Sequence, residues 1–150
     1  MLDLLSSART CSRYGFLISL SALSTKPVRD DWRGHLSALK YTEHPILTNT
    51  VFLAAWGGWP DAAESATRSL RELVRQFSAT KFASIDAEDF YDFAEQRPVI
   101  SNRSDGSRKL TWPKNEFFYW KADDGGRDLL IFIGVEPNLK WRTYTDLIHQ

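Results

Sequence analysis

A continuous apolar run, L-L-I-F-I-G-V over residues 129–135, constrains the fold of this chain more than any other feature. A strand with one face in water alternates apolar and polar residues, whereas a strand covered on both faces is apolar throughout. Residues 50–56, T-V-F-L-A-A-W, form a second run of this kind. The two runs predict an α/β protein in which both strands hold covered positions of a parallel sheet.

The first of these strands leads into a turn and a helix. Gly57 and Gly58 end the apolar run, and Pro60 suits the first turn of a helix. Asp61 and Glu64 place negative charge near the positive end of that helix. Apolar residues then recur at helical spacing, at Ala63, Ala66, Leu70, Leu73, Val74 and Phe77. The pattern predicts a unit of strand, glycine turn and helix.

Shorter patterns predict three more strands and a final helix. Residues 82–85 fit a strand reached by a crossover long enough to lie parallel to the first. Residues 109–112 and 116–120 fit two short strands broken by Pro113. Residues 139–150 fit a helix, whose stripe is Trp141, Tyr144, Leu147 and Ile148.

Two stretches show no sustained period. Residues 86–93 are acidic and aromatic, and they fit either a short helix or an irregular loop. Residues 1–43 mix serines, charges and short apolar pieces, and we expect a poorly ordered leader there, with one or two helical turns within residues 32–41. The domain is expected to occupy residues 44–150.

Targeting signals are weak in this sequence. No apolar run approaches the roughly 20 residues that a membrane-spanning helix needs. Residues 14–23 have the length of a signal-peptide core, but serines dilute them and Asp3 weakens the positive start. The lone Cys11 excludes an internal disulfide and a cysteine-rich zinc site. We therefore expect a cytoplasmic protein with no membrane partner.

The overall charge argues against a nucleic-acid partner. Nineteen basic side chains balance nineteen acidic ones, so the formal net charge is +0. Non-specific binding to nucleic acid depends on an excess of positive charge. We expect no nucleic acid to bind.

Candidate ligand-binding residues follow the predicted strands. In open α/β sheets ligands gather at the carboxyl ends of the strands, and the residues there are Gly57, Gly58, Asp61, Asp86 and Glu136. Paired glycines before a helix could admit an anion, and acidic oxygens could hold a divalent cation. The competing interpretation is structural, with glycines that supply unusual backbone angles and an aspartate that caps the helix. Because no GxGxxG or Walker loop is present, we expect no cofactor and no metal.

Catalytic machinery is not evident either. No serine lies in a G-x-S-x-G elbow, so nucleophilic hydrolysis has no visible nucleophile. The sequence favours a protein without catalytic activity over an enzyme. A domain that binds a nucleoside-like or phosphorylated small molecule, or an enzyme acting on one, stays open as the alternative.

Aromatic residues suggest a binding surface. The chain has six tryptophans, five tyrosines and nine phenylalanines, and aromatic side chains are favoured at the centres of protein interfaces. Burial of most of them in the core is the alternative. The interface candidates are Trp59, Trp112, Phe118, Trp120, Trp141 and Tyr144.

Several collinear motifs resemble one family. Residues 52–66, F-L-A-A-W-G-G-W-P-D-A-A-E-S-A, resemble the opening of the proteasome assembly chaperone 2 family, in which a strand runs into G-W-x-D-A and a small-residue helix. Residues 85–98 resemble its I-D-x-E-x-F-Y-D and R-P segment. Residues 112–113 resemble its W-P, and residues 134–142 its G-x-E-P and W-R.

This resemblance implies a three-layer α/β/α fold with a largely parallel or mixed central sheet, similar to nucleoside-phosphorylase-like domains, in a bacterial protein. It implies partners that are copies of the chain itself or proteasome subunits. Family members usually run well beyond the G-x-E-P and W-R segment, so the chain corresponds to the front half of a domain, truncated at its C-terminus. Some proteasome-docking relatives end in a hydrophobic residue, a tyrosine and one more residue, whereas this chain ends L-I-H-Q.

Overall fold

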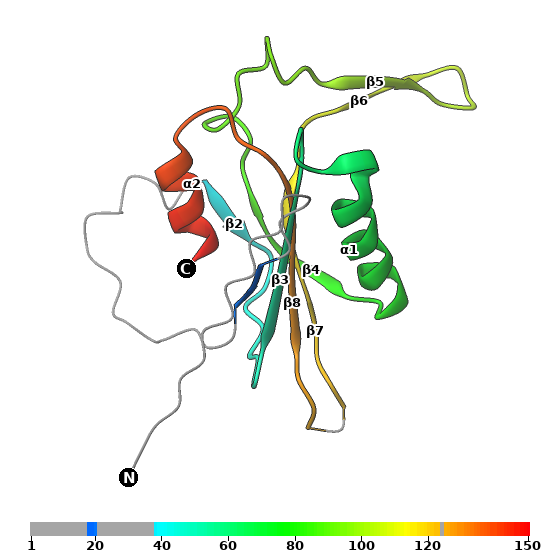
Figure 1. Ribbon diagram of the computed structural model, residues 1–150. Helices are drawn as coiled ribbons and strands as arrows, with labels where there is room; N and C mark the ends of the chain where they lie inside the picture. The colour runs from blue at the N-terminus through cyan, green and yellow to red at the C-terminus, as the bar shows by residue number, and fades with distance from the viewer. Residues whose placement is uncertain (1–17, 21–37, 124) are drawn as a thin grey trace.

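Residues 18–20, 38–123 and 125–150 are described by the computed structural model (Figure 1). A six-stranded sheet forms the centre, with the strand order β1-β3-β8-β7-β4-β2. Its strands are β1 (Ile18–Leu20), β2 (Leu39–Tyr41), β3 (Val51–Gly57), β4 (Thr80–Ile85), β7 (Asn115–Trp120) and β8 (Leu129–Val135).

The sheet is mixed, one of the two arrangements that were expected. The two apolar runs form β3 and β8, which are parallel neighbours as the sequence predicts. Each of the other pairings in this sheet is antiparallel. β4 runs in the same direction as β3, as predicted, but β8 and β7 lie between them. Parallel pairing in this sheet is therefore confined to the β3–β8 pair, which the apolar runs predicted.

A helix covers each face of the sheet (Figure 1). Alternate side chains of a strand point to opposite faces, so Ile131 and Phe132 of β8 belong to different cores. Leu70 of α1 (Ser65–Gln76) packs in the cluster that contains Ile131. Tyr144 of α2 (Trp141–Ile148) packs in the cluster that contains Phe132. The result is three layers, helix, sheet and helix.

The first helix begins later than its sequence pattern suggests. A short 3-10 turn, η2 (Ala62–Glu64), precedes α1. Ala63 and Glu64 have φ angles of 53° and 57°, outside the right-handed helical range, so the regular helix starts at Ser65. The apolar stripe is otherwise confirmed, with Leu70 fully buried.

A two-stranded ribbon stands apart from the sheet. It consists of β5 (Val99–Asn102) and β6 (Arg108–Thr111), paired in antiparallel register. The strand predicted at residues 109–112 is confirmed as β6, but β5 was not predicted. Residues 86–98 contain turns and no helix, so the loop interpretation of that stretch is correct.

The described part of the N-terminal segment supplies two edge strands, β1 and β2. The prediction of helical turns within residues 32–41 is wrong for residues 39–41, because they form the strand β2. Residues 1–17 and 21–37, which include Cys11 and most of the signal-like residues 14–23, lie outside the described residues. Of the helices described, none has the length and apolar character needed to cross a membrane.

Asp128 ties two loops together before β8. It is buried, and its side chain accepts hydrogen bonds from the backbone amides of Thr48 (2.7 Å) and Ala122 (3.0 Å). These hydrogen bonds hold the pKa of the Asp128 carboxyl below its ordinary value, and the bond from the Thr48 amide has the largest effect. The ionised carboxylate is therefore the form that the fold favours.

We predict an acid-dependent loss of stability from this residue. Because the folded-state pKa is lowered, the contribution of Asp128 is complete above the unfolded-state pKa and is lost as the pH falls through the folded-state pKa. Asp128→Asn should be less stable than the parent at neutral pH, and the gap should narrow below the ordinary pKa of 3.8. Urea unfolding at a series of pH values measures this, and a gap independent of pH would contradict it.

Candidate functional site

A cleft of about 790 Å³ lies at the carboxyl ends of β3 and β8. Its walls come from α1, from the start of β7 and from the ribbon β5–β6. Glycine backbone and apolar groups form part of the lining. Arg71, Arg97 and Lys114 add positive charge to it, and Asp61, Glu64 and Glu116 add negative charge. The cleft is therefore the place in the described chain where the predicted carboxyl-end ligand site would lie.

Four of the five predicted ligand residues lie together here: Gly57, Gly58 and Asp61 line the cleft, and Glu136 adjoins the glycine turn. The backbone amide of Glu136 donates to the carbonyl oxygen of Gly57 at 2.9 Å. Gly58 has a φ of +149°, and a Cβ there would lie 3.1 Å from Oε2 of Glu136. Glycine suits this position, because other residues rarely adopt this φ and an added Cβ would be tightly packed against the Glu136 side chain. The Glu136 side chain thus lies over the glycine turn, where an anionic ligand would be repelled.

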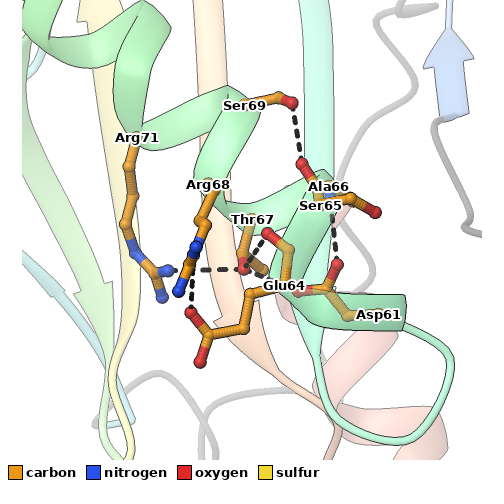
Figure 2. A network of polar contacts seen from close by, with 8 residues as sticks. All are labelled: Asp61, Glu64, Ser65, Ala66, Thr67, Arg68, Ser69 and Arg71. Atoms are coloured by element: carbon orange, nitrogen blue, oxygen red, sulfur yellow. Dashed lines mark hydrogen bonds and ion pairs between the residues drawn. The ribbon is translucent and has the colours of Figure 1, made fainter.

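Asp61 is engaged in capping α1 (Figure 2). Oδ1 accepts from the backbone amide of Ala66 at 2.8 Å, and Oδ2 accepts from the hydroxyl of Thr67 at 2.6 Å. Asp61 and Thr67 are both buried. Both carboxylate oxygens are therefore committed to the helix start, as the capping interpretation expects, and the negative charge there disfavours a second anion.

Removing this cap should destabilise the chain measurably. We predict that Asp61→Ala lowers the free energy of unfolding by about 1–2 kcal/mol, because two hydrogen bonds are lost and the Thr67 hydroxyl stays buried. Glu64→Ala is the matched control, since Glu64 is exposed and its Arg68 pair should contribute only about 0.5 kcal/mol or less. Equal effects in urea unfolding would refute the capping role.

Asp86 does not join the other candidates. It lies after β4, which β7 and β8 separate from β3, a displacement of roughly 14 Å at the usual strand spacing. Its carboxylate forms an ion pair with Lys40 at 2.5 Å and accepts from the amide of Glu88 at 3.1 Å. The hydrogen bond from Lys40, and to a smaller extent that from the Glu88 amide, holds the pKa of Asp86 below its ordinary value. Asp86 thus links β4 to β2 at the sheet edge.

A buried polar network on the opposite face was not predicted. Oδ1 of Asn115 accepts from the hydroxyls of Tyr91 and Tyr144, each at 2.8 Å, and from the amide of Val135 at 3.1 Å. Burial raises the pKa of both tyrosines, so the hydroxyls stay protonated and can donate. An asparagine at the head of an aromatic strand is the sequence signal that could have pointed to this network.

The interface candidates divide between surface and core. Trp59 is 98% exposed, and Trp112 and Trp141 are each 47% exposed. Tyr144 is fully buried, so its assignment to an interface is wrong and it belongs to the core. Two others are half-buried. Phe118 packs against the core cluster that contains Leu70 and Ile131, and Trp120 packs against Phe77. The spacing of apolar residues along the sequence does not show which of these aromatic side chains are exposed and which are buried.

No three His, Cys, Asp or Glu side chains are grouped to hold a metal ion within residues 38–123 and 125–150. The cleft therefore offers a mixed surface of cations, carboxylates, backbone and apolar groups rather than a coordination site. Such a surface can bind an anion or an apolar group, and its geometry alone assigns no reaction.

Comparison with known proteins supplies the remaining evidence. The sequence pattern of the PAC2 family matches residues 55–150. A PAC2 family protein from Streptomyces avermitilis is 35% identical, with a TM-score of 0.55, and the match covers 63% of this chain and 40% of that one. A proteasome-assembly chaperone homologue from Mycobacterium tuberculosis shows the same identity and coverage, with a TM-score of 0.56.

A more distant structure shares the fold alone. A Mycobacterium tuberculosis protein of unknown function is 18% identical, with a TM-score of 0.56 over 85% of this chain and 43% of its own. A search of curated proteins found no match. The chain thus spans about 40% of the length of the solved structures it resembles.

Proposed function

This chain belongs to the PAC2 family, and we propose that it is a non-catalytic module that assembles with copies of itself or with other proteins. The observation that carries the proposal is the exposure of large aromatic side chains. Trp59 is 98% exposed, and a tryptophan contributes much contact area at low entropic cost when an interface covers it. A partner that buries Trp59 would therefore gain substantial affinity.

Proteasome subunits are the first heterologous partner to consider. One relative with 35% identity is described as a proteasome-assembly chaperone homologue. This supports a proteasome α-subunit as a binding partner where the source cell has a proteasome. The chain itself is the other candidate partner, because a second copy could cover the exposed tryptophans.

Capture of purified proteasome α-subunits by the tagged chain tests the heterologous part of the proposal. We expect retention by the parent and at least about tenfold weaker retention by Trp59→Ser, because a central aromatic contact is lost. Ile46→Ser is the matched control, since Ile46 is also an exposed apolar residue, at 80%. No retention of any subunit would restrict the proposal to self-assembly.

The cleft supports a second candidate, a domain that binds a phosphorylated or nucleoside-like molecule. Arg71, Arg97 and Lys114 line the cleft together with Trp112, and such groups suit an anion with a planar apolar part. Glu64 and Glu116 line the same cleft, and Lys114 lies 4.0 Å from Glu116, so Arg71 and Arg97 are the main cationic groups for such a ligand. Asp61 and Glu136 would not serve as ligand groups here, because both carry negative charge at the turn. Thermal unfolding with millimolar nucleosides, nucleotides or phosphate tests this, and unchanged melting temperatures would refute it.

A further inference from the structure

The acidic side chains that line the cleft already have partners within the chain. Asp61 is committed to the start of α1 by its two hydrogen bonds. Glu64 pairs with Arg68 at 3.1 Å, and Glu116 pairs with Lys81 at 2.8 Å. Neither Arg68 nor Lys81 is among the residues that line the cleft, so both glutamates are balanced by charge from outside it.

Two arginines in the lining have no acidic partner. In the part of the chain that the structure describes, neither Arg71 nor Arg97 forms an ion pair. The third cation of the lining, Lys114, lies 4.0 Å from the carboxylate of Glu116 and shares that acid with Lys81. The cleft therefore holds two guanidinium groups whose charge is available to a bound anion.

A buried hydroxyl holds Arg71 in place (Figure 2). Nη1 of Arg71 donates to Oγ1 of Thr67 at 3.3 Å, and that hydroxyl donates onward to Oδ2 of Asp61 at 2.6 Å. Thr67 is 1% exposed and Asp61 is 7% exposed, so the acceptor of Arg71 is fixed in the wall of the cleft. Arg97 is held through Nε, which donates to the carbonyl oxygen of Ala94 at 3.2 Å.

The same cleft offers an aromatic ring to a ligand. Trp112 lines it and is 47% exposed. The ring of Phe93 packs against the indole at a centroid distance of 4.8 Å and an angle of 70°, so the indole is held while much of it stays uncovered. Ile133 and Phe118 add apolar surface to the lining. The volume of about 790 Å³ lies within the roughly 300–1,000 Å³ of small-molecule sites.

We propose that the cleft binds an aromatic phosphomonoester, a small molecule in which a planar ring carries one phosphate. Arg71 and Arg97 hold the phosphate, and Trp112 stacks on the ring. A phosphate monoester carries a charge of about −1.5 to −2 at pH 7, which matches two guanidinium groups. Arginine also fits phosphate oxygens with two parallel hydrogen bonds. The inference rests on the ligand-binding candidate proposed above and names its ligand class.

Isothermal titration calorimetry of the full chain tests this assignment with phenyl phosphate and adenosine monophosphate. Both should bind, and phenyl sulfate, which has a similar shape but a single charge, should bind at least about tenfold more weakly. Arg71→Gln and Arg97→Gln should each weaken the binding of both phosphates at least about tenfold. Trp112→Leu should weaken phenyl phosphate and leave inorganic phosphate unchanged, because only the stacking contact is lost.

Arg68→Gln is the matched control. Arg68 is an exposed arginine of the same helix that pairs with Glu64 and is not part of the lining, so this variant should bind like the parent. Thr67→Val should weaken binding, because Arg71 loses the acceptor that positions it, whereas Thr67→Ser keeps the hydroxyl and should bind like the parent. Circular dichroism verifies the fold of every variant.

The possible failures have different meanings. If none of the ligands binds at millimolar concentration, both the ligand-binding candidate and this inference are overturned. If the phosphates bind but the variants of Arg71 and Arg97 bind them normally, or if phenyl sulfate binds equally well, only this inference is overturned. An equal loss in Arg68→Gln would also overturn it, because the effect would then come from overall charge.

Discussion

Replacing Tyr144 by alanine is expected to lower the free energy of unfolding by about 3–5 kcal/mol, the range for deleting a large buried aromatic side chain. Tyr144 is fully buried in α2, and its ring lies edge-on to Phe90 at a centroid distance of 5.3 Å. Its hydroxyl bonds to Asn115, which the truncation would leave with fewer donors. Urea unfolding followed by circular dichroism gives the value.

Two further variants separate the contributions at this position. Tyr144→Phe keeps the ring and removes only the hydroxyl, so a smaller loss of about 1–2 kcal/mol is expected. Trp141→Ala changes the same helix at a half-exposed residue and should cost about 1 kcal/mol or less. If Tyr144→Ala left stability unchanged and instead abolished self-association, the residue would belong to an interface after all.

Replacing Gly134 by valine should be comparably damaging, with a loss of about 3 kcal/mol or more. A Cβ at this position would lie 2.7 Å from two ring carbons of Phe132 and 2.8 Å from Oδ1 of Asn115. Both neighbours are themselves buried, so neither can move without disturbing the core. The side chain of Asn115 passes over this strand because residue 134 has none. Thermal unfolding measures the loss.

Gly57→Ala is the appropriate comparison for Gly134. Gly57 lies on the adjacent strand, opposite Val135, and a Cβ there would meet only ordinary contacts at 3.7 Å and 3.8 Å. We expect a change within about 1 kcal/mol. Similar losses at both positions would mean that the effect comes from strand glycines in general rather than from the approach of Phe132 and Asn115.

The elements that the sequence predicted well are those with a local cause. The apolar runs of β3 and β8 reveal strands covered on both faces, and the α/β class follows from them. The stripe in α2 predicted its extent, and the capping interpretation of Asp61 is confirmed by its bonds to Ala66 and Thr67. Each of these signals lies within a few residues of the structure it specifies.

The features that were missed depend on contacts between distant segments. β4 is separated from β3 by two strands that follow it in sequence, so no local pattern reveals its neighbours. β5 is a short exposed strand whose pairing with β6 is the only source of its regularity. Asp86 and Glu136 follow strands that run in one direction, yet strand order places Asp86 at the far side of the sheet.

The burial of individual aromatic residues could not be predicted from the sequence either. Trp141 and Tyr144 belong to one apolar stripe, but only Tyr144 faces the sheet, where Asn115 accepts its hydroxyl. A stripe of this width covers more of the helix than the neighbouring layer contacts. The exposed remainder, with Trp59, is the surface that the proposed function uses.

The central claim, that this PAC2 chain is a self-assembling module, is tested most directly by its mass in solution. Size-exclusion chromatography with light scattering, run on the 150-residue chain over a wide range of concentrations, determines that mass. The account predicts a discrete oligomer, because the exposed tryptophans would be covered by a second copy. A folded monomer at every concentration would contradict it.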